Sequence, residues 1–210
     1  MLEYRIQNAT QSDKQTTPTI ILIHGYGSHA DDLFSFAPYL PYNHTIIAIQ
    51  ASLSLGLNSY AWYPLQMDAS GVVTSEVDAA WQAVDLIVKT IKELIELHNL
   101  DPKDISLLGF SQGAILSWAI AYHYPLMIRR VLALSGMLHE SVNTSKPPTF
   151  KAYVSHGIND PVIPISKPRK SIKPLSNKYE TISYFEYDDG HNVSQENFSQ
   201  LIDWITKTNL

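Results

Sequence analysis

The sequence contains no cysteine, which excludes disulfide bonds, thiolate metal sites and a cysteine nucleophile. It also has no run that approaches the ~20 consecutive apolar residues of a membrane-spanning helix. Its first residues lack the basic start and apolar core of a signal peptide. We therefore expect a cytoplasmic protein without stable membrane insertion.

Positive charge is also scarce, with 15 Lys and Arg against 20 Asp and Glu, and a formal net charge of −5. Because no basic field and no basic-aromatic module are present, we expect no nucleic acid partner. The histidines do not recur at the spacing of metal ligands, so no metal site is expected. One basic cluster exists, and we interpret it as a solvated face: Lys167, Arg169, Lys170, Lys173 and Lys178.

What the chain has in abundance is short apolar runs bounded by turn residues, which are typical of strands buried on both faces. They span residues 19–23, 45–51, 105–109, 130–135, 150–154 and 181–187. Between them, helices are predicted over residues 76–99, 111–124 and 195–207, with Ser75 as a candidate cap of the first. This alternation predicts a single α/β domain over residues 1–210, with a mostly parallel central sheet and helices on both faces.

Two segments depart from that regular pattern. Residues 165–178 are expected to form a short or kinked helix, because Pro174 would interrupt a continuous one. The long connection over residues 51–75 is too apolar for disorder and carries Trp62, Leu65 and Met67. We interpret these three residues as a substrate-binding wall or lid, and plain core packing is the competing interpretation.

The strongest functional signal is Leu-Leu-Gly-Phe-Ser-Gln-Gly at residues 107–113. An apolar run that breaks into G-x-S-x-G before a helix predicts a sharp strand-to-helix turn that holds Ser111 out as a nucleophile. The glycines are needed because the backbone and the following helix come too close there for a Cβ. The competing interpretation of Ser111 alone is an ordinary helix cap.

A serine hydroxyl becomes a good nucleophile when an imidazole takes its proton and a carboxylate orients that imidazole. His191 follows the predicted strand at 181–187, and Asp160 follows the one at 150–154. Asp188 and Asp189 are alternative acids, but they stand so close to His191 in sequence that a bond across the loop is awkward. The favoured catalytic set is Ser111, Asp160 and His191.

Acyl transfer also needs backbone N–H groups that stabilise the oxyanion. One donor is expected from Gln112, the residue after the nucleophile. The other is expected from Tyr26, in the glycine-containing turn His24-Gly25-Tyr26-Gly27 after the first central strand. Both roles belong to the backbone, so we expect the identity of these side chains to matter little.

Taken together these motifs resemble the α/β-hydrolase fold and, within it, the phospholipase/carboxylesterase family of small serine esterases and acyl-protein thioesterases. The resemblance covers nearly the whole chain and rests on residues 24–27 with 31–33, 61–63, 109–113, 156–164 and 190–194. It implies a Ser111–His191–Asp160 triad, an oxyanion hole at Tyr26 and Gln112, and no cofactor. Carboxylic esters, lysophospholipids or fatty-acyl thioesters would be the substrates.

Several alternatives stay open at this point. A longer acyl channel would indicate an acyl-protein thioesterase or lysophospholipase instead of a carboxylesterase, and the fold could also serve as a non-catalytic binding module. A peptidase is disfavoured, because the chain lacks room for the propeller domain of many peptidases with this fold. Some relatives pair through exposed apolar strips near the site, so a homodimer is also left open.

Overall fold

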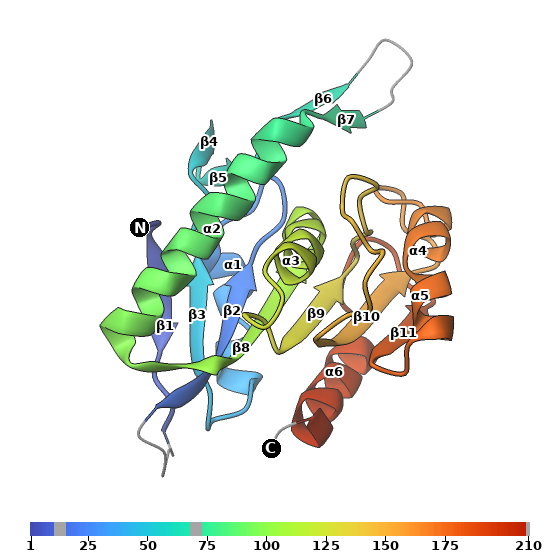
Figure 1. Ribbon diagram of the computed structural model, residues 1–210. Coiled ribbons are helices and arrows are strands. Elements are labelled where there is room, and N and C mark those ends of the chain that lie inside the picture. Colours follow the sequence, from blue (N-terminus) through green and yellow to red (C-terminus); the bar gives the residue numbers. More distant parts are fainter. Residues whose placement is uncertain (11–15, 68–72, 209–210) are drawn as a thin grey trace.

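The computed structural model describes residues 1–10, 16–67 and 73–208, and its centre is a seven-stranded sheet (Figure 1). In spatial order the strands are β1 (Tyr4–Gln7), β3 (Thr45–Ile49), β2 (Thr17–Ile23), β8 (Leu100–Phe110), β9 (Arg130–Leu134), β10 (Lys151–Gly157) and β11 (Ile182–Tyr187). Within the described part of this sheet, only β1 pairs in the antiparallel sense. The prediction of a mostly parallel sheet is confirmed, and the six predicted strands are all present.

The strand β1 was not predicted from the sequence. It has only four residues, and all of them are half-buried. An edge strand of this length has neither a continuous apolar run nor a wholly buried face, so its pattern does not stand out. Its pairing with β3 extends the sheet beyond the parallel strands.

Helices cover both faces of the sheet, because alternate residues of a strand point to opposite sides. Ile21 and Ile23 of β2 pack in one core with α2 (Val77–His98) and α3 (Gln112–His123). Ile20 and Leu22 pack in the other with α1 (Ala30–Phe34), the 3-10 turn η1 (Ala37–Tyr39) and α6 (Gln195–Thr208). Figure 1 shows α2 lying across one face, with α3 beside it over the middle of the sheet.

The predicted helices are confirmed to within one or two residues at each end, but the predicted cap of α2 is wrong. Ser75 belongs to a strand, and Glu76 occupies the cap position without a side-chain capping bond. The segment at 165–178 is broken into α4 (Ser166–Ser171) and α5 (Lys173–Lys178), as expected from Pro174. Proline in the first turn of α5 has no N–H for a continuing helix, and its ring would clash one turn earlier.

The long connection after β3 folds into two small hairpins. These are β4 (Leu53–Gly56) with β5 (Ser59–Ala61), and β6 (Leu65–Met67) with β7 (Val73–Ser75). Figure 1 shows the second hairpin beyond the N-terminal end of α2. In the described part of the chain, no helix combines the length and the apolarity needed to cross a membrane.

Candidate active site

Ser111 stands between β8 and α3 in a strained turn, with φ of 52° and ψ of −115°. Its side chain makes no capping bond to α3, so the ordinary cap interpretation is not supported. The flanking glycines are sterically required: a Cβ at Gly109 would lie 2.4 Å from the carbonyl oxygen of Gly113, and one at Gly113 would lie 1.9 Å from that of Ile23. The turn therefore holds the Ser111 hydroxyl away from the helix, at the carboxyl edge of the sheet.

His191 and Asp160 reach Ser111 from two loops at this same edge. The Nε2 atom of His191 lies 3.0 Å from the Oγ atom of Ser111, and its Nδ1 atom lies 2.7 Å from the Oδ2 atom of Asp160. Because the carboxylate can only accept, Nδ1 carries a hydrogen and Nε2 is free to accept one from the serine. The side chain of Asp160 is completely buried, whereas that of His191 is 16% exposed and so faces the site's opening.

The two loops are held together by their backbones. The N–H of Ile158 donates to the carbonyl of Tyr187 at 2.8 Å, and that of Asn159 donates to the carbonyl of Asp189 at 2.9 Å. A Cβ at Gly157 would lie 2.1 Å from the carbonyl oxygen of Gly190, so only glycine permits this approach. Parallel pairing of β10 with β11 thus determines that the acid and the histidine meet.

The alternative acids point elsewhere. The Oδ1 atom of Asp188 accepts a hydrogen bond from the side-chain amide of Asn159 at 2.7 Å, and Asp189 accepts a long one from Asn192 at 3.4 Å. Both bonds are at the surface. Among the described residues, Asp160 is the acid that bonds the ring of His191.

The predicted oxyanion donors lie on either side of Ser111. Gln112 is the first residue of α3, so its N–H has no acceptor one turn earlier in the helix. Tyr26 lies in the turn after β2, and a Cβ added at its neighbour Gly25 would lie 3.3 Å from the Cβ of Ser111. The turn thus passes directly beside the serine, and Gly27 provides its left-handed residue, with φ of 79°.

The side chain of Gln112 has a role that the sequence did not indicate. Its Oε1 atom accepts from the N–H of Trp62 at 2.9 Å, and its Nε2 atom donates to the carbonyl of Tyr63 at 2.9 Å. The indole N–H of Trp62 in turn donates to the carbonyl of His24 at 2.8 Å. The expectation that this side chain matters little is therefore wrong, because it ties the connection after β5 to the serine turn.

The three predicted substrate-wall residues are placed differently. Trp62 is only 6% exposed and packs in the core, in line with the competing core-packing interpretation. Leu65 on β6 is 36% exposed and available to a ligand. Met67 ends β6, and its side chain lies outside the described residues.

His24 supports the turn that contains Tyr26 from inside the protein. Its Nδ1 atom lies 2.8 Å from the carbonyl oxygen of Gly25, and its Nε2 atom accepts from the N–H of Ala51 at 3.1 Å. This pairing requires the neutral ring with its hydrogen on Nδ1. Burial accordingly lowers the pKa of His24 below its ordinary 6.5.

A pH-dependent stability follows from that lowered pKa. Because the fold favours neutral His24, its contribution is complete above 6.5 and is lost as the pH falls from 6.5 toward the folded-state value. We expect the free energy of unfolding to decrease with acidification, by at most ~1.4 kcal/mol per pH unit from this one group. In His24→Asn, where the amide can still donate to Gly25 but does not titrate, the decrease should be shallower. Urea unfolding across this range measures both slopes, and parallel profiles would contradict the assignment.

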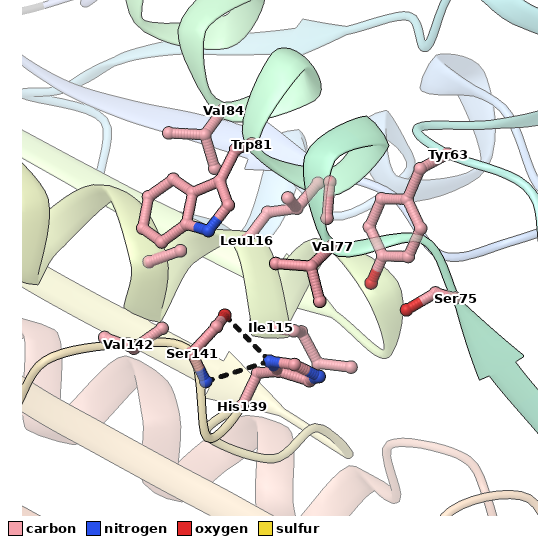
Figure 2. A pocket seen from close by; sticks show the side chains of 12 residues that line it. Tyr63, Ser75, Val77, Trp81, Val84, Ile115, Leu116, His139, Ser141 and Val142 are labelled. Atoms are coloured by element: carbon pink, nitrogen blue, oxygen red, sulfur yellow. Dashed lines mark hydrogen bonds between the residues drawn. The ribbon is translucent and has the colours of Figure 1, made fainter.

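A small cavity lies between the start of α2, α3 and residues 139–142 (Figure 2). Its walls are mostly apolar and include Trp81 and Ile115. His139 lines it too, and its Nδ1 atom accepts from the N–H of Ser141 at 3.1 Å and lies 2.8 Å from the Ser141 hydroxyl. The Nε2 atom of His139 therefore carries the hydrogen.

This cavity is small and lies near Ser111 without being lined by it. Ile115 follows Ser111 by one turn of α3, and Tyr63 is bonded to Gln112. Burial raises the pKa of the Tyr63 phenol to about 12, so its hydroxyl stays a donor at the cavity wall. The cavity volume is about 20 Å³, which is room for about one water molecule.

A mostly parallel sheet, helices on both faces and a strained serine turn at the carboxyl edge define the α/β hydrolases. The family described as phospholipase/carboxylesterase matches residues 5–209, and the chain belongs to this family. The protein is thus a hydrolase. In the described residues, no group of three or more His, Asp or Glu side chains is arranged to hold a metal ion.

Individual proteins agree with this assignment. Acyl-protein thioesterase 1 of Kluyveromyces lactis is 25% identical over 93% of this chain and 94% of its own length. The structure of esterase PE8 has a TM-score of 0.85 at 21% identity and covers 99% of each chain. The carboxylesterase of Bacillus cereus has a TM-score of 0.82 at 16% identity, over 99% of this chain and 94% of its own.

Proposed function

We propose that this hydrolase cleaves carboxylic esters by acyl transfer to Ser111. The observation that supports the proposal most is the continuous line of hydrogen bonds from the Ser111 hydroxyl through His191 to Asp160, at 3.0 and 2.7 Å. A continuous set of hydrogen bonds of this kind is needed by a serine that gives up its proton. An ordinary surface serine forms its hydrogen bonds with water. The strained backbone at Ser111 supports the same role.

In the first half-reaction, the Oγ atom of Ser111 attacks the substrate carbonyl carbon while the Nε2 atom of His191 takes the serine proton. The carbonyl oxygen becomes an oxyanion and accepts hydrogen bonds from the N–H groups of Tyr26 and Gln112, each worth ~3 kcal/mol. Asp160 stabilises the imidazolium that forms. His191 then passes the proton to the leaving alcohol oxygen as the carbon–oxygen bond breaks.

The second half-reaction uses the same groups with water. His191 takes a proton from a water molecule, whose oxygen attacks the acyl carbon of the acyl-enzyme. A second oxyanion forms in the same hole and collapses, the acyl–Oγ bond breaks, and Ser111 recovers its proton from His191. The free carboxylic acid then leaves. Every bond and proton of the cycle is accounted for without a redox step or a metal ion.

Short acyl groups are the first substrates to assay. Among the described residues, the cavity of about 20 Å³ at the start of α2 is lined by neither Ser111 nor His191, so its size does not set the acyl length. Leu65, exposed at the edge of the connection, is a candidate contact for such a group. Trp62 acts on substrate only through the turn that it supports, and Met67 remains a sequence-based candidate.

A thioester is the second candidate substrate, because curated relatives carry the name acyl-protein thioesterase. The same relay would protonate a leaving sulfur in place of an oxygen. Rates across a series of acyl lengths, measured on matched esters and thioesters, separate the two candidates, since each CH₂ that a channel buries adds ~0.8 kcal/mol of binding. A homodimer remains a proposal that sedimentation would test.

A fluorophosphonate probe tests the proposed nucleophile directly. We expect stoichiometric covalent labelling of the wild type, with the modified peptide carrying the adduct on Ser111, and no labelling of Ser111→Ala. The matched control is Ser145→Ala, since Ser145 is exposed on a loop and should leave labelling unchanged. A wild-type protein that resists the probe, or an adduct on another residue, would favour the non-catalytic binding module instead.

A further inference from the structure

His156 is a fully buried histidine that contacts the acid of the proposed relay. It lies at the carboxyl end of β10, and its Nε2 atom is 3.1 Å from the Oδ2 atom of Asp160. The same Nε2 atom is 2.8 Å from the carbonyl oxygen of Ile163. Both side chains of the His156–Asp160 pair are 0% exposed, so water does not mediate or compete with this contact.

The geometry fixes where the hydrogen of His156 lies. Both neighbours of Nε2 are oxygen atoms that only accept hydrogen bonds, so Nε2 must carry the hydrogen. The hydrogen bond goes to the carbonyl of Ile163, and the Oδ2 atom of Asp160 lies beside it within ion-pair distance. The Nδ1 atom is buried and, within the described residues, has no hydrogen-bond partner. A second hydrogen on Nδ1 would be buried without an acceptor, which is costly. The ring is therefore the Nε2–H tautomer.

Four nitrogen atoms lie around the carboxylate of Asp160. Its Oδ1 atom accepts from the backbone N–H groups of Val162 at 2.8 Å and Ile163 at 2.9 Å. Its Oδ2 atom is bonded by His191 at 2.7 Å and contacted by His156 at 3.1 Å. The loop holds one oxygen, and the two histidines hold the other.

We propose that His156 is a positioning residue for acyl transfer, which keeps the Oδ2 atom of Asp160 directed at the Nδ1 atom of His191. This inference rests on the proposed function. Without the Nε2–H group, Oδ2 would lose one of its two partners and the carbonyl of Ile163 would lose a buried donor, so the carboxylate could turn and the loop could loosen. His191 would then be misaligned with Ser111, and a small misplacement of reacting groups lowers the rate strongly.

A pair of substitutions separates the N–H donor from the bulk of the ring. In His156→Met the side chain fills a similar space but donates no hydrogen bond, and we expect kcat per active site to fall by about 10- to 100-fold with KM unchanged. In His156→Gln the terminal amide can place an N–H group near the former Nε2 position, and kcat should recover for the most part. Active sites are counted by fluorophosphonate titration. Because kcat is calculated per titrated site, a smaller fraction of folded protein does not lower its value. His123→Met, at an exposed histidine, is the control.

The outcomes separate this inference from the proposed function. A wild type that turns over esters, with His156→Met at wild-type kcat per site, would overturn the positioning role, and so would equal losses in His156→Met and His156→Gln. A wild type that neither turns over esters nor reacts with the probe would refute the proposed function and the inference that rests on it. Should the variants fail to fold, ¹H–¹⁵N long-range NMR of the wild type still decides the geometry: we expect His156 as the Nε2–H tautomer, and an Nδ1–H tautomer would overturn the inference.

Discussion

Replacing Ser111 with alanine is expected to lower kcat for a short chromogenic ester by about 10⁶-fold, as removal of a serine nucleophile does elsewhere. Replacing His191 with alanine should cost about as much, because the hydroxyl and the imidazole that takes its proton work as one unit. The double variant should therefore be no slower than either single one. Stopped-flow and steady-state rates for the three proteins measure this non-additivity.

The residual rate of these variants is informative as well. With the backbone donors of Tyr26 and Gln112 intact, turnover should remain about 10³-fold above the uncatalysed rate. Ser145→Ala serves as the control that keeps full activity. If the rate losses of the two single variants multiply in the double variant, Ser111 and His191 act independently. That result would contradict a common proton relay.

The substitution Gly113→Ala is expected to destabilise the protein by about 3 kcal/mol and to abolish most activity. Helix propensity alone predicts the opposite sign, since alanine favours a helix interior over glycine by ~1 kcal/mol. The decisive term is steric: the added Cβ would lie 1.9 Å from the carbonyl oxygen of Ile23 and 2.8 Å from that of His24, and neither backbone atom can rotate away. Urea unfolding gives the free energy, and ester turnover gives the activity.

Activity should suffer because the backbone at residues 23–24 leads into the turn that contains Tyr26, so any shift there moves the Tyr26 N–H. The control is Gly56→Ala, in the β4–β5 hairpin. Its φ is 90°, but no atom lies within 4 Å of an added Cβ, so only the backbone strain of ~1 kcal/mol is expected, with turnover unchanged. Equal stability of wild type and Gly113→Ala would show that the close approach of α3 to β2 is not a constraint.

Much of this architecture could be predicted because its signals are local. Short apolar runs and helical spacing indicated six of the seven sheet strands and the three longer helices, and Pro174 indicated the break between α4 and α5. The strand β1 was missed because four half-buried residues at an edge carry little pattern. The Ser75 cap was wrong because pairing of β6 with β7 keeps that residue in a strand. Pairing partners lie far apart in sequence, and local propensity does not register them.

The candidate site, like the fold, could be predicted from the sequence only in part. The motifs supplied Ser111, Asp160 and His191 as candidates, but nothing local indicated that the Gln112 side chain would bond residues 62–63, or that His156 would contact Asp160. A glutamine after a serine was predicted only as a backbone donor, and a histidine before a glycine gives no local sign of its partner. Their partners come from other loops, which meet only after β2, β8, β10 and β11 have assembled into one edge.

By itself, the sequence determined the fold class and the chemistry at stake, because hydrophobic periodicity and the G-x-S-x-G spacing are patterns formed by neighbouring residues. Tertiary structure decided which acid bonds His191 and that Trp62 belongs to the core. The physical reason is the short range of these interactions. Hydrogen bonds and close packing act over a few ångströms in space, between atoms that the chain separates by tens of residues, and only the assembled sheet brings them within reach.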